Sequence, residues 1–100
     1  MSHWKVEMTK GSEAQLILDF RSGIVSTDDI KVIKRWVHEV ESEGLEWAQN
    51  NITWRDHELT GKWKNHRAIS FSYSGRVIYR IENEKIIVRV VRITTDHDYK

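Results

Sequence analysis

The sequence predicts an α+β fold, in which a mostly antiparallel four-stranded sheet carries a two-helix hairpin on one face. Two patterns lead to this prediction. Apolar residues recur every three or four positions between residues 13 and 50, and they alternate with polar residues in four short segments, one before the helices and three after residue 65. The chain has 100 residues, 39% of them hydrophobic, which suits one core. We expect a single domain over residues 1–100 with the element order β-α-α-β-β-β.

The first strand and the first helix are predicted in residues 3–21. Residues 3–8 alternate apolar and polar side chains, as a half-buried strand does. Gly11 should end this strand, and Ser12 should cap a short helix over residues 13–21. Gly23 can adopt the left-handed conformation that commonly ends a helix.

A longer second helix should follow. Ser26 or Thr27 can cap it, and the helix should continue to about Asn50, because apolar positions recur at helical spacing with an acidic stripe opposite them. Trp36 and Trp47 flank the apolar stripe, so we expect them to cover the edge of the core.

Residues 51–65 show neither the helical nor the strand period and contain Gly61, Trp54 and Trp63. We therefore expect a long loop. Loops of this length are uncommon in small domains and often carry function.

Three strands should complete the sheet. The predicted segments are residues 66–73, 76–82 and 85–95, separated by short turns at residues 74–75 and 83–84. The last segment is apolar on both faces, as a central strand would be.

The charge is distributed unevenly along the chain. Residues 1–50 hold six Lys and Arg against nine Asp and Glu, whereas residues 51–100 hold ten against six. Most of the basic residues of the second half lie in the predicted strands or beside them, which indicates a positively charged sheet face and a polyanionic partner.

Several classes of protein are disfavoured by the sequence. There is no cysteine and no HExxH, P-loop or GxGxxG pattern, so disulfides and the common metal, nucleotide and dinucleotide sites are not expected. No apolar run approaches membrane-spanning length, and residues 1–10 lack the apolar centre of a signal peptide. We expect a cytoplasmic protein without a metal ion, a cofactor or a membrane contact.

The remaining candidates for chemistry are His57, His66, His97 and Arg76. Cleavage of RNA without a metal ion needs a base for the 2′-hydroxyl proton, an acid for the leaving 5′-oxygen, and positive charge for the transition state. Histidine and arginine meet these needs near neutral pH. Each of these residues could equally be a solvated surface side chain, and the residues by themselves indicate only an anion-binding α+β domain.

Three segments in order resemble the RelE/ParE toxin superfamily. They are Leu-Thr-Gly-Lys-Trp-Lys-Asn-His-Arg at residues 59–67, Arg-Val-Ile-Tyr-Arg-Ile at 76–81, and Thr-Asp-His-Asp-Tyr at 95–99. The similarity is clearest over residues 54–99 and is nearest to the YafQ, YoeB and RelE ribosome-dependent mRNA endonucleases. It implies a RelE-like fold, cleavage of mRNA in the decoding site (A site) of the 30S ribosomal subunit, and neutralisation by a cognate antitoxin protein.

The resemblance also assigns roles to single residues. His57 matches the loop histidine of the YafQ-like D-H-x-L-x-G-x-W pattern, which is assigned to acid/base work. Arg76 matches the strand arginine that holds the scissile phosphate, and His97 matches the C-terminal general acid or base. Tyr99 takes the neighbouring aromatic position. Ser70 stands where YafQ-like toxins have a strand histidine, and small residues replace the lysine pair of RelE.

Basic residues near this predicted site are the expected contacts with RNA. They are Lys62, Lys64, His66, Arg67 and Arg80. Two other functions remain open, because one fold hosts them all: a ParE-like inhibitor of DNA gyrase, and a non-catalytic module that binds RNA or a protein partner.

The antitoxin segment should be acidic and amphipathic, with charge steering its association and Trp54 or Trp63 serving as an apolar anchor. The alternative is that Trp63 packs inward and fixes the loop to the sheet.

Overall fold

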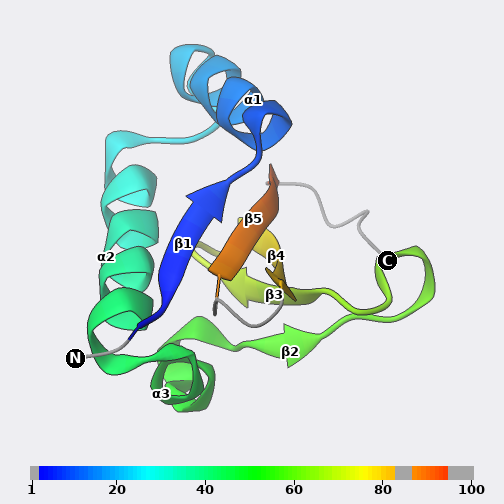
Figure 1. Ribbon diagram of the computed structural model, residues 1–100. Coiled ribbons are helices and arrows are strands. Elements are labelled where there is room, and N and C mark those ends of the chain that lie inside the picture. The colour runs from blue at the N-terminus through cyan, green and yellow to red at the C-terminus, as the bar shows by residue number, and fades with distance from the viewer. Residues whose placement is uncertain (1–2, 83–86, 95–100) are drawn as a thin grey trace.

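The computed structural model describes residues 3–82 and 87–94 (Figure 1). The described strands form one sheet in the order β1-β5-β4-β3-β2. Their bounds are β1 Lys5–Met8, β2 His57–Glu58, β3 Arg67–Ser70, β4 Arg76–Glu82 and β5 Ile87–Thr94. The predicted α+β class and the meander of the last three strands are confirmed.

The register of the sheet shows how the N-terminal strand joins it. The β4–β5, β3–β4 and β2–β3 pairs are antiparallel, whereas β1 pairs with β5 in parallel, with Val6 opposite Val88. This parallel pair needs a long crossover connection, which the helices supply. An irregularity between Ile78 and Tyr79 shifts the β4–β5 register by one residue.

Helix α1 spans Lys10–Arg21 and begins earlier than predicted. Thr9 caps it by accepting a hydrogen bond from the Ser12 amide at 3.2 Å, so Gly11 lies within the first turn instead of ending the strand. The Gly23 amide donates to Phe20 and the Ile24 amide to Asp19, and Gly23 has φ +82°. The predicted left-handed helix end is confirmed.

Helix α2 spans Thr27–Glu43, and its start is fixed by a reciprocal pair of hydrogen bonds. The Ser26 hydroxyl accepts from the Asp29 amide and the Asp29 carboxylate accepts from the Ser26 amide, both at 3.0 Å. This capping box satisfies two amides that the first helical turn leaves unpaired.

The prediction that this helix continues to Asn50 is wrong. The helix ends at Glu43, and a separate helix, α3, spans Leu45–Asn50. Gly44, which fits the apolar spacing, has φ 99° and ψ 155° and turns the chain between them. Glycine adopts this conformation without strain, so it can end a helix at a position that the pattern alone would continue.

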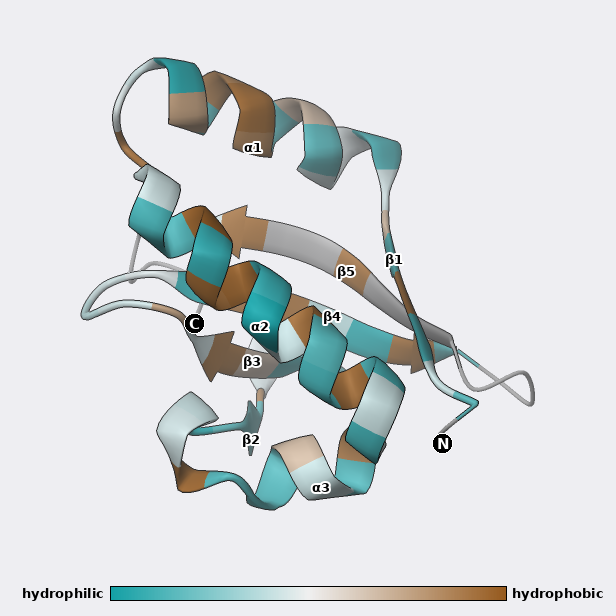
Figure 2. Cartoon of the chain, turned by 90° about the vertical axis from the view of Figure 1, so that its left-hand side faces the viewer, coloured by the Kyte–Doolittle hydropathy of each residue, from teal (hydrophilic) through white to brown (hydrophobic). Residues whose placement is uncertain are grey.

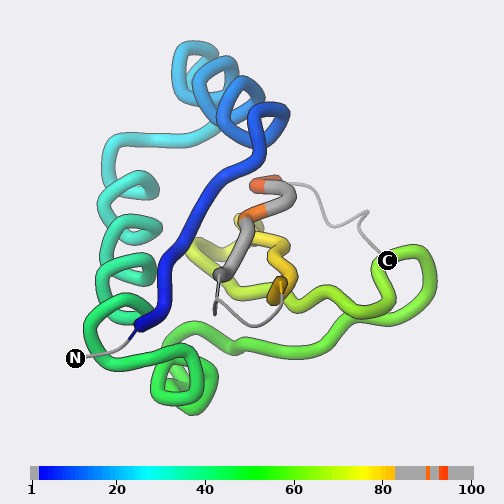
Figure 3. Tube along the Cα trace, viewed as in Figure 1, coloured from blue at the N-terminus to red at the C-terminus, as the bar shows by residue number. Residues whose placement is uncertain are grey.

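Figure 3 traces the path of residues 51–65 from α3 toward β3. This segment is not the structureless loop that the absence of a period predicts. They contain the 3₁₀ turns η1, Ile52–Trp54, and η2, Gly61–Trp63, with β2 between them. Elements of two or three residues are too short to show a period, so no periodic pattern in the sequence reveals them.

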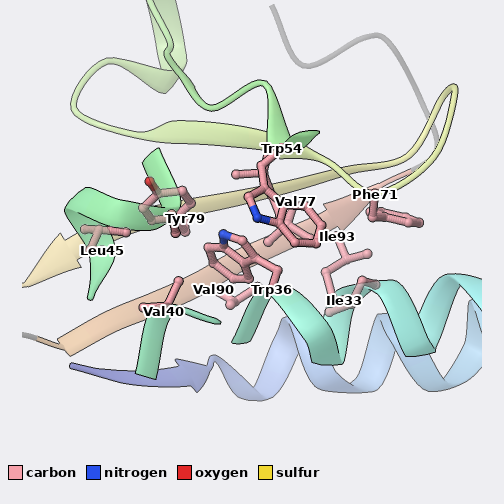
Figure 4. Close-up of a cluster of buried hydrophobic side chains, with 12 residues drawn as sticks. Ile33, Trp36, Val40, Leu45, Trp54, Phe71, Val77, Tyr79, Val90 and Ile93 are labelled. Atoms are coloured by element: carbon pink, nitrogen blue, oxygen red, sulfur yellow. The ribbon is translucent and has the colours of Figure 1, made fainter. Parts of the chain in front are cut away.

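The helices cover one face of the sheet, with α2 lying across it between α1 and α3 (Figure 2). The main core lies between this layer and the inner sheet face, and its side chains are drawn in Figure 4. Trp36 is fully buried at its centre and lies 5.4 Å from the Tyr79 ring, centroid to centroid. The prediction that Trp36 covers the edge of the core is therefore wrong. Trp47 is 60% exposed. None of the described helices has the length and apolar character needed to cross a membrane.

Candidate functional site

Two predicted site residues, Arg76 and His57, lie in adjacent cross-strand rows on the outer face of the sheet, opposite the helices. Side chains that pair directly across antiparallel strands point to the same face. One row joins Ser70, Arg76 and Thr94, and the adjacent row joins His57, Ala68, Ile78 and the backbone position of Arg92. Ala68 and Ile78 belong to a small second core with Leu59, so this face is the one that residues 59–63 partly cover.

Arg76 begins β4 and is held by the loop that precedes it. Its Nη1 donates to the carbonyls of Ser72, Tyr73 and Gly75, at 3.2, 3.3 and 2.9 Å. Within the described part of the chain, its Nε and Nη2 have no protein partner. A guanidinium offers a planar fork of donors, so a side chain fixed at one nitrogen keeps an edge available to an anion.

The loop that holds Arg76 depends on Gly75. A Cβ at this position would lie 2.4 Å from two atoms of the Phe71 ring and 2.5 Å from the Ser72 hydroxyl. The Gly75 amide donates to that hydroxyl at 2.8 Å, and its carbonyl accepts from the Phe71 amide at 3.1 Å. The close turn sets the direction in which Arg76 leaves the loop.

Backbone carbonyls also hold the rings of His57 and His66. The Nδ1 of His57 lies 2.9 Å from the Arg55 carbonyl, and the Nδ1 of His66 lies 3.1 Å from the Lys64 carbonyl. A carbonyl oxygen only accepts, so each Nδ1 donates, and in this tautomer Nε2 is the nitrogen that can accept a proton. His57 is exposed and can present this nitrogen to a substrate, whereas His66 is half-buried with its ring edge-on to Trp63.

The structure does not place His57 beside Arg76. Two strand spacings of about 4.8 Å and two residue rises of about 3.3 Å give roughly 12 Å between the two backbones. His57 therefore lies at the β2 edge of the outer face and Arg76 near its centre. A substrate that contacts both must extend across β3.

A buried polar network positions the residues before His57. Asp56 has a fully buried side chain; its Oδ1 accepts from Arg67 Nε at 2.6 Å and its Oδ2 from the Tyr79 hydroxyl at 2.5 Å. Arg67 Nη1 also lies 3.8 Å from Glu58 Oε1. Because its Nε is committed to Asp56, Arg67 holds the loop on the sheet, whatever it contributes to RNA contacts.

The network shifts two pKa values upward. Burial and then the neighbouring Asp56 carboxylate raise the pKa of Tyr79 well above its ordinary value. Burial alone lowers the pKa of Arg67, but its hydrogen bond and charge interaction with Asp56, together with Tyr79, place the pKa above its usual value. Tyr79 thus stays protonated as the donor to Asp56.

The other predicted RNA contacts are spread over the edge and the outer face. Lys62 and Lys64 are exposed in and beside η2, and Arg80 donates from Nε to Glu82 at 2.6 Å. The register places Arg80 opposite the backbone position of Arg89 on β5.

Two predicted catalytic residues, His97 and Tyr99, lie outside the described residues. The last described residue, Thr94, pairs with Arg76. No group of three or more His, Asp or Glu side chains that could hold a metal ion occurs in residues 3–82 and 87–94.

The two loop tryptophans have different surroundings. Trp54 is 2% exposed, and its Nε1 donates to the Glu39 carboxylate, so the prediction that it could serve as an exposed antitoxin anchor is wrong. Trp63 is half-buried against Leu59, Ala68 and Ile78. Trp63 therefore packs inward and holds the loop against the sheet, which is the alternative to an exposed antitoxin anchor.

Sequence reasoning missed part of the site beside Arg76. A cleft of about 610 Å³ opens there, and two of its arginines, Arg35 on α2 and Arg55 after η1, were not among the candidates. Asp56 was also missed. Arg35 lies on the polar side of an amphipathic helix and has no motif around it, whereas the Asp-His pair at residues 56–57 is visible in the sequence but carries no sign of burial.

No protein-family model matches the sequence, and no curated protein shows detectable similarity to it. Solved structures do match. YafQ from E. coli strain BL21(DE3) aligns with a TM-score of 0.72 at 17% identity, over 92% of each chain. A metal-bound toxin from Helicobacter pylori gives 0.72 at 18% identity, over 96% of this chain and 98% of that one.

YoeB in the YoeB–YefM complex from Staphylococcus aureus gives a TM-score of 0.66 at 9% identity, over 93% of this chain and 97% of that one. These matches span nearly the whole molecule, and they include two of the three toxins to which the sequence motifs pointed. The chain has the fold of the YafQ and YoeB toxins.

Proposed function

We propose that this protein is the toxin of a toxin–antitoxin pair and cleaves mRNA on the ribosome. The observation that carries the proposal is the geometry of Arg76, whose guanidinium is fixed by three loop carbonyls and keeps donors available on the outer face. The fold shared with the YafQ and YoeB toxins supports it. Fold alone does not determine function.

The proposed reaction is attack of an RNA 2′-oxygen on the adjacent phosphorus. A base takes the 2′-hydroxyl proton, the new bond forms the 2′,3′-cyclic phosphate, and the bond to the 5′-oxygen breaks. The leaving oxygen takes a proton from an acid and becomes a 5′-hydroxyl. Arg76 would bind the non-bridging oxygens, where negative charge increases in the transition state.

His97 is proposed as the acid or base of this reaction, because the sequence resemblance matches it to the C-terminal general acid or base of such toxins. Tyr99 would assist it. His57, with Nε2 available as an acceptor, is proposed to contact the same RNA at the β2 edge. Because roughly 12 Å separates the His57 and Arg76 backbones, His57 is not the nearest group to the scissile phosphate.

The proposed partner is an antitoxin that covers this face. The E. coli DinJ–YafQ and S. aureus YoeB–YefM structures are toxin–antitoxin complexes of proteins with this fold. Lys62, Lys64 and Arg80 would attract an acidic segment as well as RNA.

Induced expression in bacteria tests the function. We expect arrested translation, with mRNA fragments that carry a 5′-hydroxyl. Arg76→Ala and His97→Ala should each slow cleavage on the order of 10²-fold or more. Arg21→Ala, an exposed arginine at the end of α1, is the matched control and should remain as toxic as the parent.

Full toxicity of both site variants would contradict the proposal. Inhibition of DNA supercoiling by the purified protein, without cleaved mRNA, would instead identify the gyrase inhibitor. RNA binding without cleavage on translating ribosomes would identify the non-catalytic module. Melting curves of each variant separate loss of function from loss of folding.

A further inference from the structure

We propose that the cleft beside Arg76 is a nucleotide subsite, which holds a second RNA phosphate with Arg35 and Arg55 and stacks a base on Tyr73. The inference rests on the proposed function and deepens it, because it states where the RNA continues from Arg76. The cleft is bounded by α2, η1 and the β3–β4 loop. Its lining residues are Val32, Arg35, Thr53, Trp54, Arg55, Ser70, Phe71, Ser72, Tyr73 and Arg76.

The lining is positively charged without compensation. Arg35, Arg55 and Arg76 are its charged residues, and no carboxylate belongs to the described lining. None of the ion pairs found among the described residues involves these three arginines. Three guanidinium groups around one cavity repel one another, and a bound phosphate relieves that repulsion.

Two of the three arginines are held in place, Arg35 by a buried aromatic ring and Arg76 by backbone carbonyls. The Arg35 guanidinium lies 5.7 Å from the centre of the Trp54 ring, and Trp54 is in turn held by Glu39. Figure 4 shows Trp54 and Phe71, both lining residues, within the packed cluster, so this wall of the cleft is part of the core. Arg76 is held by the loop carbonyls. A preformed set of donors loses less freedom when it binds an anion.

Tyr73 supplies a surface for a base. It lies in the β3–β4 loop and is 96% exposed, which is unusual for so large an aromatic side chain. Its carbonyl is bonded to Arg76, so the loop that carries the ring is tied to the phosphate-binding side chain. Aromatic rings that stack bases beside a basic groove are the common arrangement in proteins that bind single-stranded nucleic acid.

An acidic protein segment is the alternative occupant, since carboxylates also pair with arginine. RNA fits better for two reasons. The cleft adjoins the Ser70–Arg76–Thr94 row, where the scissile phosphate is proposed to bind, so a continuous strand reaches both. Tyr73 is almost fully exposed, so its ring face is available for a base to stack on.

The test measures binding of a fluorescent, 2′-O-methylated tetranucleotide, which cannot be cleaved by 2′-oxygen attack. Arg35→Gln and Arg55→Gln should each weaken binding on the order of tenfold at low salt. Each should also reduce the slope of log affinity against log salt by about 0.7, the loss of one phosphate contact with single-stranded nucleic acid. Tyr73→Ala should weaken binding about tenfold with an unchanged slope, because stacking releases no counterions.

Lys34→Gln is the matched control, because Lys34 is an exposed cation next to Arg35 on α2 and does not line the cleft. It should keep the parent slope. The inference is overturned if Arg35→Gln and Arg55→Gln bind the tetranucleotide as Lys34→Gln does, or if the parent protein does not bind it. It is also overturned if the two variants lose only the binding of a glutamate-rich peptide, which would make the cleft a protein-binding site.

The proposed function can fail separately. Absence of mRNA cleavage on ribosomes would refute the endonuclease and leave the affinity for an uncleavable RNA unchanged. Melting curves of all four variants show whether a loss of affinity follows from unfolding. Arg35 and Arg55 are both exposed on different elements, so each arginine variant provides an independent measurement.

Discussion

At the scale of single residues, the site combines side chains fixed by buried partners with side chains that face solvent. Asp56 and Tyr79 are buried and bonded to each other, and the neighbouring His57 is exposed. Trp36 is buried, yet its Nε1 has no hydrogen-bond partner among the described residues. Among the described residues, the core thus holds a donor without a partner at its centre, while both oxygens of the Asp56 carboxylate are bonded.

Tyr79→Phe tests this network through pH. Because the pKa of Tyr79 is raised in the folded state, the unfolded protein loses this proton near pH 10 and the folded protein keeps it. The contribution to the free energy of unfolding is therefore complete below pH 10 and is lost as the pH rises above it. The difference in stability between the parent and Tyr79→Phe should be constant below pH 10 and then fall by about 1.4 kcal/mol per pH unit.

Urea unfolding monitored between pH 7 and pH 11 gives this difference. The other tyrosines and the lysines titrate in both proteins, so they cancel in the comparison. A difference that does not change above pH 10 would show that the Tyr79 hydroxyl is not held by Asp56.

At the scale of elements, the helical layer is divided by a glycine. Gly44 carries φ 99° and separates α2 from α3, and this break lets α3 begin the path toward η1 and β2. The contacts of α3 with Tyr79, through the Gln49 amide at 3.3 Å, depend on that change of direction.

Gly44→Ala and Gly11→Ala should have opposite effects. At Gly44 the backbone conformation is nearly exclusive to glycine, so alanine should reduce the free energy of unfolding by about 1–3 kcal/mol. Gly11 lies inside α1, and a Cβ added there would have no neighbouring atom within 4 Å, so alanine should stabilise the protein by up to about 1 kcal/mol. Thermal unfolding of both variants measures the signs. If alanine raised the free energy of unfolding at both positions, α2 and α3 would join as one helix in solution.

At the scale of the whole molecule, charge is separated along the chain and across the fold. The basic second half forms the outer sheet face with its flanking loops, and the acidic first half forms much of the helical layer. A partner that binds the outer face is therefore attracted before contact.

We expect salt to slow association of an acidic antitoxin segment with this protein. Stopped-flow measurements between about 50 and 500 mM salt should show the association rate falling steeply and the dissociation rate changing less, because screening acts mainly on the encounter. An association rate that is independent of salt would contradict charge steering.

Substitution of Trp63 tests whether this side chain anchors the antitoxin, when the same stopped-flow measurement is combined with melting curves of the free protein. Because Trp63 packs against Leu59, Ala68 and Ile78, Trp63→Ala should destabilise the free protein by about 2 kcal/mol. Trp63→Phe, which keeps an aromatic ring and removes an Nε1 that has no partner among the described residues, is the control and should cost less. A faster antitoxin dissociation with an unchanged melting temperature would restore the anchor role.

Local patterns in the chain were sufficient to predict the α+β class, the bounds of β4, the capping of α2 at either Ser26 or Thr27, and the left-handed turn at Gly23. These features depend on periodicity and on chemistry within a few residues, which a sequence displays directly. The motifs also indicated the fold of the YafQ and YoeB toxins, and they singled out Arg76 as the centre of the proposed site.

The remaining features arise from tertiary contacts. The folded chain pairs β1 with β5, buries Trp36, Trp54 and Asp56, and brings Arg35 and Arg55 beside Arg76 from separate elements. Each of these outcomes depends on contacts between residues far apart in the chain, and no periodicity records them. Gly44 shows the same limit locally, since its spacing fits a continuous helix and the chain there adopts a conformation that ends one.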